Sequence, residues 1–153
     1  DQRFADIGAL TEQLQTIAAN AETTAQSQLE LEQKLEYLQK RHAVELRLVH
    51  MLYASWRDGP AHGIPAFDQQ VGVLVTCDLF DPEWYKQANP DIAESGMSPQ
   101  EHYVRSGAFE GRNPGPNFDT MSYYIANRDV ADAGWPALVH YAMFGQAEGR
   151  PTA

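Results

Sequence analysis

The amino-acid sequence predicts an all-α protein: a long N-terminal coiled-coil helix followed by a small module of two tandem helical repeats. Two observations support this fold class. Apolar residues recur with a heptad period through the first part of the chain, and one motif occurs twice in the second part at a constant offset of 38 residues. The predicted segments are a coiled-coil oligomerisation helix (1–58), a linker with a short capping segment (59–78), repeat 1 (79–115) and repeat 2 (116–153).

The N-terminal segment has the pattern of a coiled coil from Ile7 onward. Ten of the fourteen a and d positions between residues 7 and 52 are apolar, and no proline occurs before Pro60. An apolar period of 3.5 residues sustained over seven heptads favours helices that pair along this stripe. We therefore predict a homo-oligomer, and we call the large apolar a and d residues the seam: Ile7, Leu10, Leu14, Ile17, Leu31, Leu35, Leu38, Val49 and Leu52.

Polar residues interrupt the seam at two places. Thr24 and Gln28 form one weak point, and His42 and Glu45 form the other. Such residues lower the stability of a coiled coil but can fix its register. A seam histidine could act as a proton-sensitive switch, although hydration or a bond to Glu45 is the simpler interpretation. An intramolecular hairpin broken near residues 20–27 is the alternative to the oligomer, and it is less favoured because this stretch has no Gly or Pro turn.

The helix is expected to end at a joint that begins with Gly59 and Pro60. The run 71–76 that follows is rich in β-branched residues, which favour a strand, but the surrounding pattern offers no partner strand. We therefore predict a short buried helix that covers the first repeat. Additional apolar residues widen the face of the long helix just before the joint, which suggests a third helix or docking of the repeats there: Val44, Leu46 and Leu48.

Each repeat carries signals for three short helices. Fourteen identical residues match between 80–112 and 118–150. Predicted N-caps are Asp81, Asn89 and Ser98 with their counterparts Asp119 and Asn127, and predicted stops are Gly96, Gly134, Gly107 and Gly145. The shared core is expected to consist of Phe80, Tyr85, Ile92, Tyr103, Phe118, Tyr123, Val130 and Tyr141.

The repeated polar residues could carry function, but each also has a structural explanation. Asp and Asn suit helix caps, the histidines lie beside core tyrosines, and Glu-Gly-Arg can close a loop by an ion pair across the glycine. Aromatic residues that the two copies do not share could stack on sugar rings, although filling the core between repeats is the simpler role. The candidate glycan or partner surface comprises Trp84, Tyr124, Trp135, Phe144, Glu110, Arg112, Glu148 and Arg150.

Charge and composition exclude several classes of function. The net charge of −10 makes nucleic acid an unlikely partner, because such proteins need clustered Lys and Arg to displace counterions. Cys77 is the single cysteine, so no intramolecular disulfide can form. No apolar run has the length of a membrane span. No metal-ligand spacing, nucleophile elbow or triad is present, so we expect no catalytic residue, no metal and no cofactor in this chain.

The repeat motif resembles the tandem repeats that accompany glycosyltransferase domains in bacterial polysaccharide synthesis, including O-antigen and capsule systems. The resemblance covers about 79–151 and not the coiled coil, and this chain departs from the pattern at Lys86, Ser122 and Arg128. It implies a cytoplasmic location at the inner membrane, reached through parts outside this chain. The residues that carry it are Phe80-Asp81, Tyr85, Asn89, Asp91, Gly96, His102-Tyr103 and Glu110-Gly111-Arg112, with their counterparts in the second copy.

We therefore expect a non-catalytic oligomerisation and docking region of a glycosyltransferase or surface-polysaccharide assembly protein. Its repeats would bind a partner protein or glycan. A structural or adhesive protein that presents the repeats on a coiled-coil stalk at the cell surface is the main alternative. A small hydrolase using the paired acids Glu110 and Glu148 is a third, less favoured hypothesis, because a duplicated catalytic site would be unusual.

Overall fold

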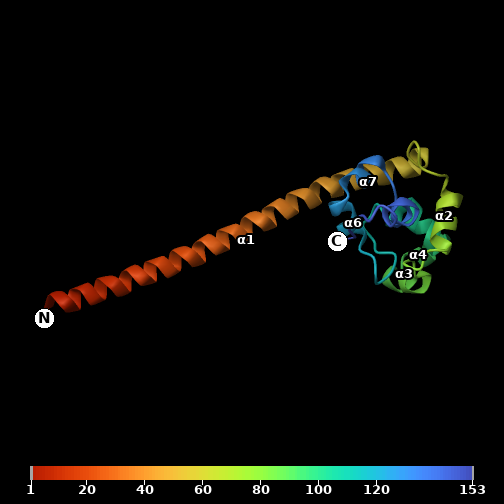
Figure 1. Cartoon of the computed structure of the whole chain (residues 1–153). Helices are drawn as coiled ribbons and strands as arrows, with labels where there is room; N and C mark the ends of the chain where they lie inside the picture. The colour runs from red at the N-terminus through yellow and green to blue at the C-terminus, as the bar shows by residue number, and fades with distance from the viewer. Residues whose placement is uncertain (1, 153) are drawn as a thin grey trace. The chain divides into compact units, whose positions relative to one another are not determined.

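The computed structural model describes residues 2–152, and within that range every regular element is a helix (Figure 1). The predicted all-α class is therefore confirmed. Two of the short helices continue into a π-helical turn. The elements are α1 (Gln2–Asp58), α2 (Phe67–Val75), α3 (Pro82–Ala88), α4 (Ile92–Ser95), α5 (Pro99–His102), η1 (Tyr103–Gly107), α6 (Thr120–Ala126), α7 (Arg128–Ala133), α8 (Ala137–His140) and η2 (Tyr141–Gly145).

The chain divides into two compact units, with the boundary between Gln39 and Lys40 inside α1. In the first unit α1 runs without a break through residues 20–27, so the hairpin alternative is wrong. Its residues from Gln2 to Gln39 are all exposed. The seam residues of this unit are between 48 % and 67 % exposed: Ile7, Leu10, Leu14, Ile17, Leu31, Leu35 and Leu38.

In the second unit the end of α1 packs against the repeats. Val44, Leu48, Met51 and Ser55 are buried, and their spacing of three or four residues places them on one face of the helix. The Ser55 hydroxyl donates to the carbonyl oxygen of Arg105 at 3.1 Å. The predicted docking of the repeats on this helix is therefore correct for Val44 and Leu48, while Leu46 is 61 % exposed.

The joint contains a helix and not a strand at the ambiguous run. Gly59 ends α1 with a positive φ of 83°, a conformation that a residue without a Cβ adopts at little cost. α2 then buries Gln70 and Leu74. The prediction of a helix over the run 71–76 is confirmed as far as Val75, where α2 ends, and no strand lies beside it within residues 2–152. Of the apolar side chains in this run Leu74 is buried, whereas Val75 is 65 % exposed.

The two repeats fold alike, as three short helices each. The Asp81 carboxylate accepts from the backbone N–H groups of Glu83 and Trp84, and Asp119 accepts from that of Ser122, so both predicted aspartate caps are confirmed. Gly96 and Gly134 end their helices in the left-handed conformation. The predicted core residues are buried, except that Tyr141 is only partly so.

The two asparagines were predicted to be N-caps, and this is wrong for their side chains. The Asn89 amide donates to the Tyr85 carbonyl oxygen at 2.9 Å, and the Asn127 amide makes the same bond to Tyr123. Each asparagine therefore closes the end of the preceding helix. No side-chain cap bond forms at the start of the helix that follows.

The glycines at the end of each third segment do not stop a helix by positive φ. Gly107 and Gly145 are the last residues of the π-helical turns η1 and η2, and both are buried. A Cβ at Gly107 would collide with the hydroxyl of Tyr85, and one at Gly145 would collide with that of Tyr123. Glycine is thus required by the close approach of a tyrosine to the backbone.

A hydroxyl pair joins the two repeats. Tyr103 of the first repeat is completely buried, and its hydroxyl lies 2.9 Å from the Thr120 hydroxyl at the start of α6. Thr120 also donates to the Arg112 carbonyl oxygen at 2.8 Å. The first repeat therefore ends in contact with the first turn of the second.

Candidate functional site

The repeated acidic and basic residues form one ion-pair cluster in each copy. In repeat 1 the Arg112 guanidinium contacts Asp91 at 2.7 Å and Glu110 at 2.5 Å. In repeat 2 Arg150 lies 2.7 Å from Asp129 and 2.6 Å from Glu148. The predicted ion pair across the glycine is present in both copies, and the carboxylates are held to arginines instead of facing each other.

These ion pairs lower the pKa of the aspartates. The bond from Arg112 holds the pKa of Asp91 below its usual range, and the bond from Arg150 does the same for Asp129. The pKa of each arginine is raised by the same contacts. Both carboxylates therefore remain charged near neutrality and fasten the last loop of the repeat to its second helix.

The repeated histidines are bonded to buried tyrosines seventeen residues earlier in the chain. His102 Nδ1 lies 3.1 Å from the Tyr85 hydroxyl, and His140 Nδ1 lies 2.9 Å from that of Tyr123. Burial, reinforced by the nearby arginine, lowers the pKa of each histidine. Burial also raises the pKa of Tyr123 to about 12. Both partners are thus neutral at physiological pH, and the pair serves to fix the third segment of the repeat.

Stability is expected to fall as the pH is lowered from about 7.5 to 5.5. The folded histidines have lowered pKa values, so the unfolded chain binds more protons once the pH drops below its own histidine pKa of about 6.5. Urea unfolding at several pH values measures how the free energy of unfolding changes with pH. Replacing both His102 and His140 with glutamine should reduce this pH dependence. An unchanged pH dependence in that variant would refute its assignment to the two histidines.

The predicted aromatic surface is only partly assembled. Trp135 and Phe144 lie edge to face with ring centroids 5.5 Å apart, and His140 joins them at 5.6 Å from Trp135. Phe144 is 41 % exposed, so this cluster offers an accessible ring. Trp84 is partly exposed on α3 of the other repeat.

Tyr124 was included in this surface, and the structure contradicts that. It is completely buried, and its hydroxyl donates to the Trp135 carbonyl oxygen at 2.8 Å. Tyr124 fills the core of repeat 2, in agreement with the alternative role considered for these aromatics. The accessible rings of repeat 2 are therefore those of Trp135 and Phe144. His140 contacts both rings but is itself buried, and its spacing of four residues to Phe144 was the signal for this contact in the sequence.

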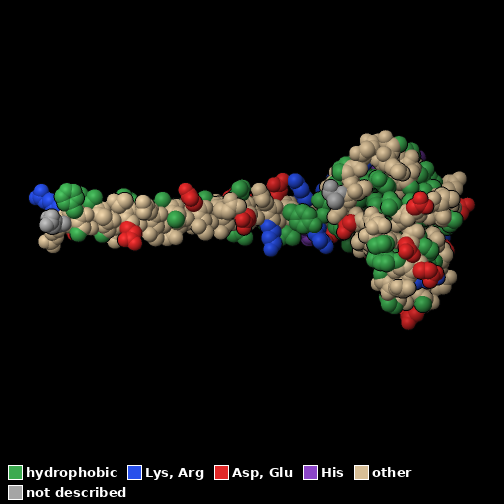
Figure 2. Space-filling view, turned by 60° about the horizontal axis from the view of Figure 1, so that its bottom comes forward, with side chains coloured by type: hydrophobic (Ala, Val, Ile, Leu, Met, Phe, Trp, Pro, Cys, Tyr) green, Lys and Arg blue, Asp and Glu red, His purple; other side chains and the backbone are tan. Residues whose placement is uncertain are grey.

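An exposed apolar face of α1 lies within the second unit, and of its residues only Leu46 and Val49 were identified from the sequence. Leu46, Val49, Tyr53 and Trp56 are 61 %, 63 %, 77 % and 54 % exposed. One shallow hollow on this face is lined by Leu46, Val49 and Tyr53. A second lies between α1 and repeat 1, with Tyr53 and Trp56 on one side and Glu110 on the other. Figure 2 shows hydrophobic side chains at intervals along α1. The signal available in the sequence was Trp56, which continues the heptad spacing from Val49.

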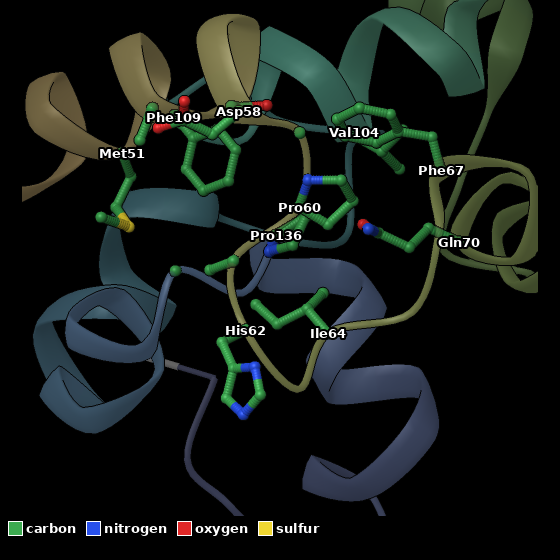
Figure 3. A pocket seen from close by; sticks show the side chains of 15 residues that line it. Met51, Asp58, Pro60, His62, Ile64, Phe67, Gln70, Val104, Phe109 and Pro136 are labelled. Atoms are coloured by element: carbon green, nitrogen blue, oxygen red, sulfur yellow. The ribbon is translucent and has the colours of Figure 1, made fainter.

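A cavity of about 250 Å³ lies between the end of α1, the joint and the repeats (Figure 3). Its walls are largely apolar, and Gln70 supplies a polar group: its Nε2 donates to the Pro65 carbonyl oxygen at 2.7 Å. The Gln70 Oε1 atom is buried without a protein partner. A water molecule or a small ligand with one donor would satisfy it. Other lining residues are Met51, Phe67, Val104, Phe109 and Pro136.

Within residues 2–152 no group of three or more His, Cys, Asp or Glu side chains could hold a metal ion. No helix of that range combines the length and apolarity needed to cross a membrane. Comparisons of the chain with models of protein families, with curated proteins and with solved structures gave no match.

Proposed function

We propose that this chain is a non-catalytic region that oligomerises through α1 and presents its two repeats for docking. The observation that carries the proposal is the exposed seam of the first unit, whose seven large apolar residues lie along one heptad stripe and are roughly half to two-thirds exposed. In a single helix this apolar stripe stays in contact with water and therefore contributes little to the stability of the helix. Pairing with the stripe of another copy buries it and supplies the packing that stabilises a long helix.

The polar residues that the two repeats share are used internally, which leaves the accessible aromatic rings as the features available for docking. Every repeated histidine, aspartate and arginine described above has a bonding partner within its own repeat. The accessible features are the Trp135 and Phe144 rings, with exposed carboxylates on the same repeat. Aromatic faces with nearby polar groups bind sugars or the apolar side chains of a protein.

The motif resemblance supports a setting in the assembly of bacterial surface polysaccharide. We propose that the parent protein is a glycosyltransferase or an associated assembly protein, located in the cytoplasm at the inner membrane. The partner of the repeats would be the growing glycan or another protein of that assembly.

Sedimentation equilibrium of the chain tests the oligomer, and a monomer at micromolar concentration would refute it. Docking is tested by titrating the chain with purified O-antigen or capsular polysaccharide while following tryptophan fluorescence. A response that the Trp135→Phe variant loses and the Trp84→Phe variant keeps would support glycan binding at the aromatic cluster. No response in the unmodified chain would leave a protein as the partner.

A further inference from the structure

The exposed face at the end of α1 points away from the buried face that holds the repeats and touches them at its edge, where Trp56 bonds to Ser106. Val44, Leu48, Met51 and Ser55 occupy the c and g positions of the heptads and are buried. The exposed residues Leu46, Val49, Tyr53 and Trp56 occupy the a and e positions. At 100° per residue the centres of these two sets lie about 150° apart around the helix. The repeats therefore leave the a and e face of residues 46–56 open.

This open face continues the heptad frame of the first unit. Val49 and Trp56 are a positions in the same frame as Ile7 and Leu35, with no insertion that would shift the stripe. The Trp56 indole N–H donates to the Ser106 hydroxyl at 3.0 Å, which fixes the ring while 54 % of the residue stays exposed. The d residue Leu52 is partly buried against the core of the second unit, so the exposed a and e residues are the ones left for pairing there. A second copy of this chain has the matching stripe.

The polar layers of the seam determine the orientation. In a parallel pair in register, each polar residue meets the same residue of the other copy, so Thr24 and Gln28 pair with hydrogen-bonding groups. In the antiparallel register that overlaps the whole seam, Gln28 faces Leu31 and Glu45 faces Leu14. Those contacts would bury a polar group against leucine without a partner.

Glu45 is the residue that a parallel pair must accommodate, because two copies of a carboxylate then share one layer. Its charge is already balanced within each copy: the Arg41 guanidinium contacts the Glu45 carboxylate at 2.8 Å. The repulsion is reduced by this ion pair, and His42 in the adjacent layer provides another hydrogen-bonding group.

We infer that two copies of this chain associate in parallel and in register, and that the interface extends beyond the first unit to Val49, Tyr53 and Trp56. This inference rests on the proposed oligomerisation and adds its orientation and its extent.

Single cysteines in the full chain, each in a Cys77→Ser background, test this arrangement. Leu10→Cys and Val49→Cys should each form disulfides with their own kind, because a paired seam holds identical positions together at a high effective concentration. The matched control is Leu29→Cys, which lies on the same helix outside the a and d positions and should link about tenfold less. Circular dichroism of the reduced variants checks that the helix is intact.

An equimolar mixture of Leu10→Cys and Val49→Cys separates the two orientations. The antiparallel register would produce disulfides between positions 10 and 49, detected by mass spectrometry of the linked peptides, and this would overturn the inference. An oligomeric mass with no link at Val49 would also overturn it, because the interface would then stop short of the second unit. A monomeric mass would instead refute the proposed oligomerisation itself, so the two failures are distinguishable.

Discussion

Replacing Leu35 with glutamate is expected to dissociate the proposed oligomer and to lower the helix content of the first unit. Leu35 is an a residue that is 57 % exposed in the single chain and would be buried in a pair. Loss of a buried leucine alone costs about 2–5 kcal/mol, and every copy would also place a charge in the same layer. The dissociation constant should rise more than about 100-fold. Sedimentation equilibrium and far-UV circular dichroism measure both effects.

Leu29→Glu is the matched control for this prediction. It makes the same change on the same helix, at a residue that is 48 % exposed and outside the a and d positions. We expect the molar mass of this variant to equal that of the unmodified chain. If the two substitutions weakened association equally, the seam would be assigned to the wrong face of α1.

Substitution of Gly107 by alanine is expected to destabilise the second unit by about 2 kcal/mol. The added Cβ would collide with the Tyr85 hydroxyl and would lie 3.4 Å from His102 Nδ1. Because Tyr85 is completely buried and bonded to His102, it cannot move aside without losing that bond. The free energy of unfolding from a urea titration gives the size of the effect.

Two further variants make this test specific. Gly72 lies inside α2 with no atom within 4 Å of an added Cβ, so Gly72→Ala should be neutral or stabilising by up to about 1 kcal/mol. In the Tyr85→Phe background the colliding hydroxyl is gone, and the Gly107→Ala penalty should shrink. An equal penalty in both backgrounds would show that the cost arises from the π-helical turn and not from the tyrosine.

The sequence pattern was sufficient to predict the elements whose signals are local and periodic. The heptad stripe predicted α1, and the aspartates at 81 and 119 predicted the starts of α3 and α6. Repetition identified the core positions, because both copies keep the aromatic residues that fill equivalent places. An N-cap aspartate bonds within three residues of itself, so its role can be inferred without knowledge of the fold.

The features that were missed depend on contacts between distant residues. Asn89 has the composition of an N-cap, but its amide is used by Tyr85 and its oxygen accepts from Arg112, twenty-three residues away. Gly107 resembles a helix stop, although its requirement comes from a tyrosine of an earlier helix. Tyr124 could not be assigned to the core until the carbonyl group that its hydroxyl meets was located. The open face of α1 likewise became evident only when the repeats were seen to occupy the opposite side.

The hydroxyl pair between Tyr103 and Thr120 distinguishes the first repeat from the second. Thr120 corresponds to Pro82 in repeat 1, and proline has no hydroxyl to meet a tyrosine. If the order of the two copies were exchanged, the tyrosine of the leading copy would meet proline and its hydroxyl would lose the threonine as a hydrogen-bond partner. The two copies are thus not interchangeable, even though they share one fold. A single residue at the start of α6 specifies which repeat follows the other.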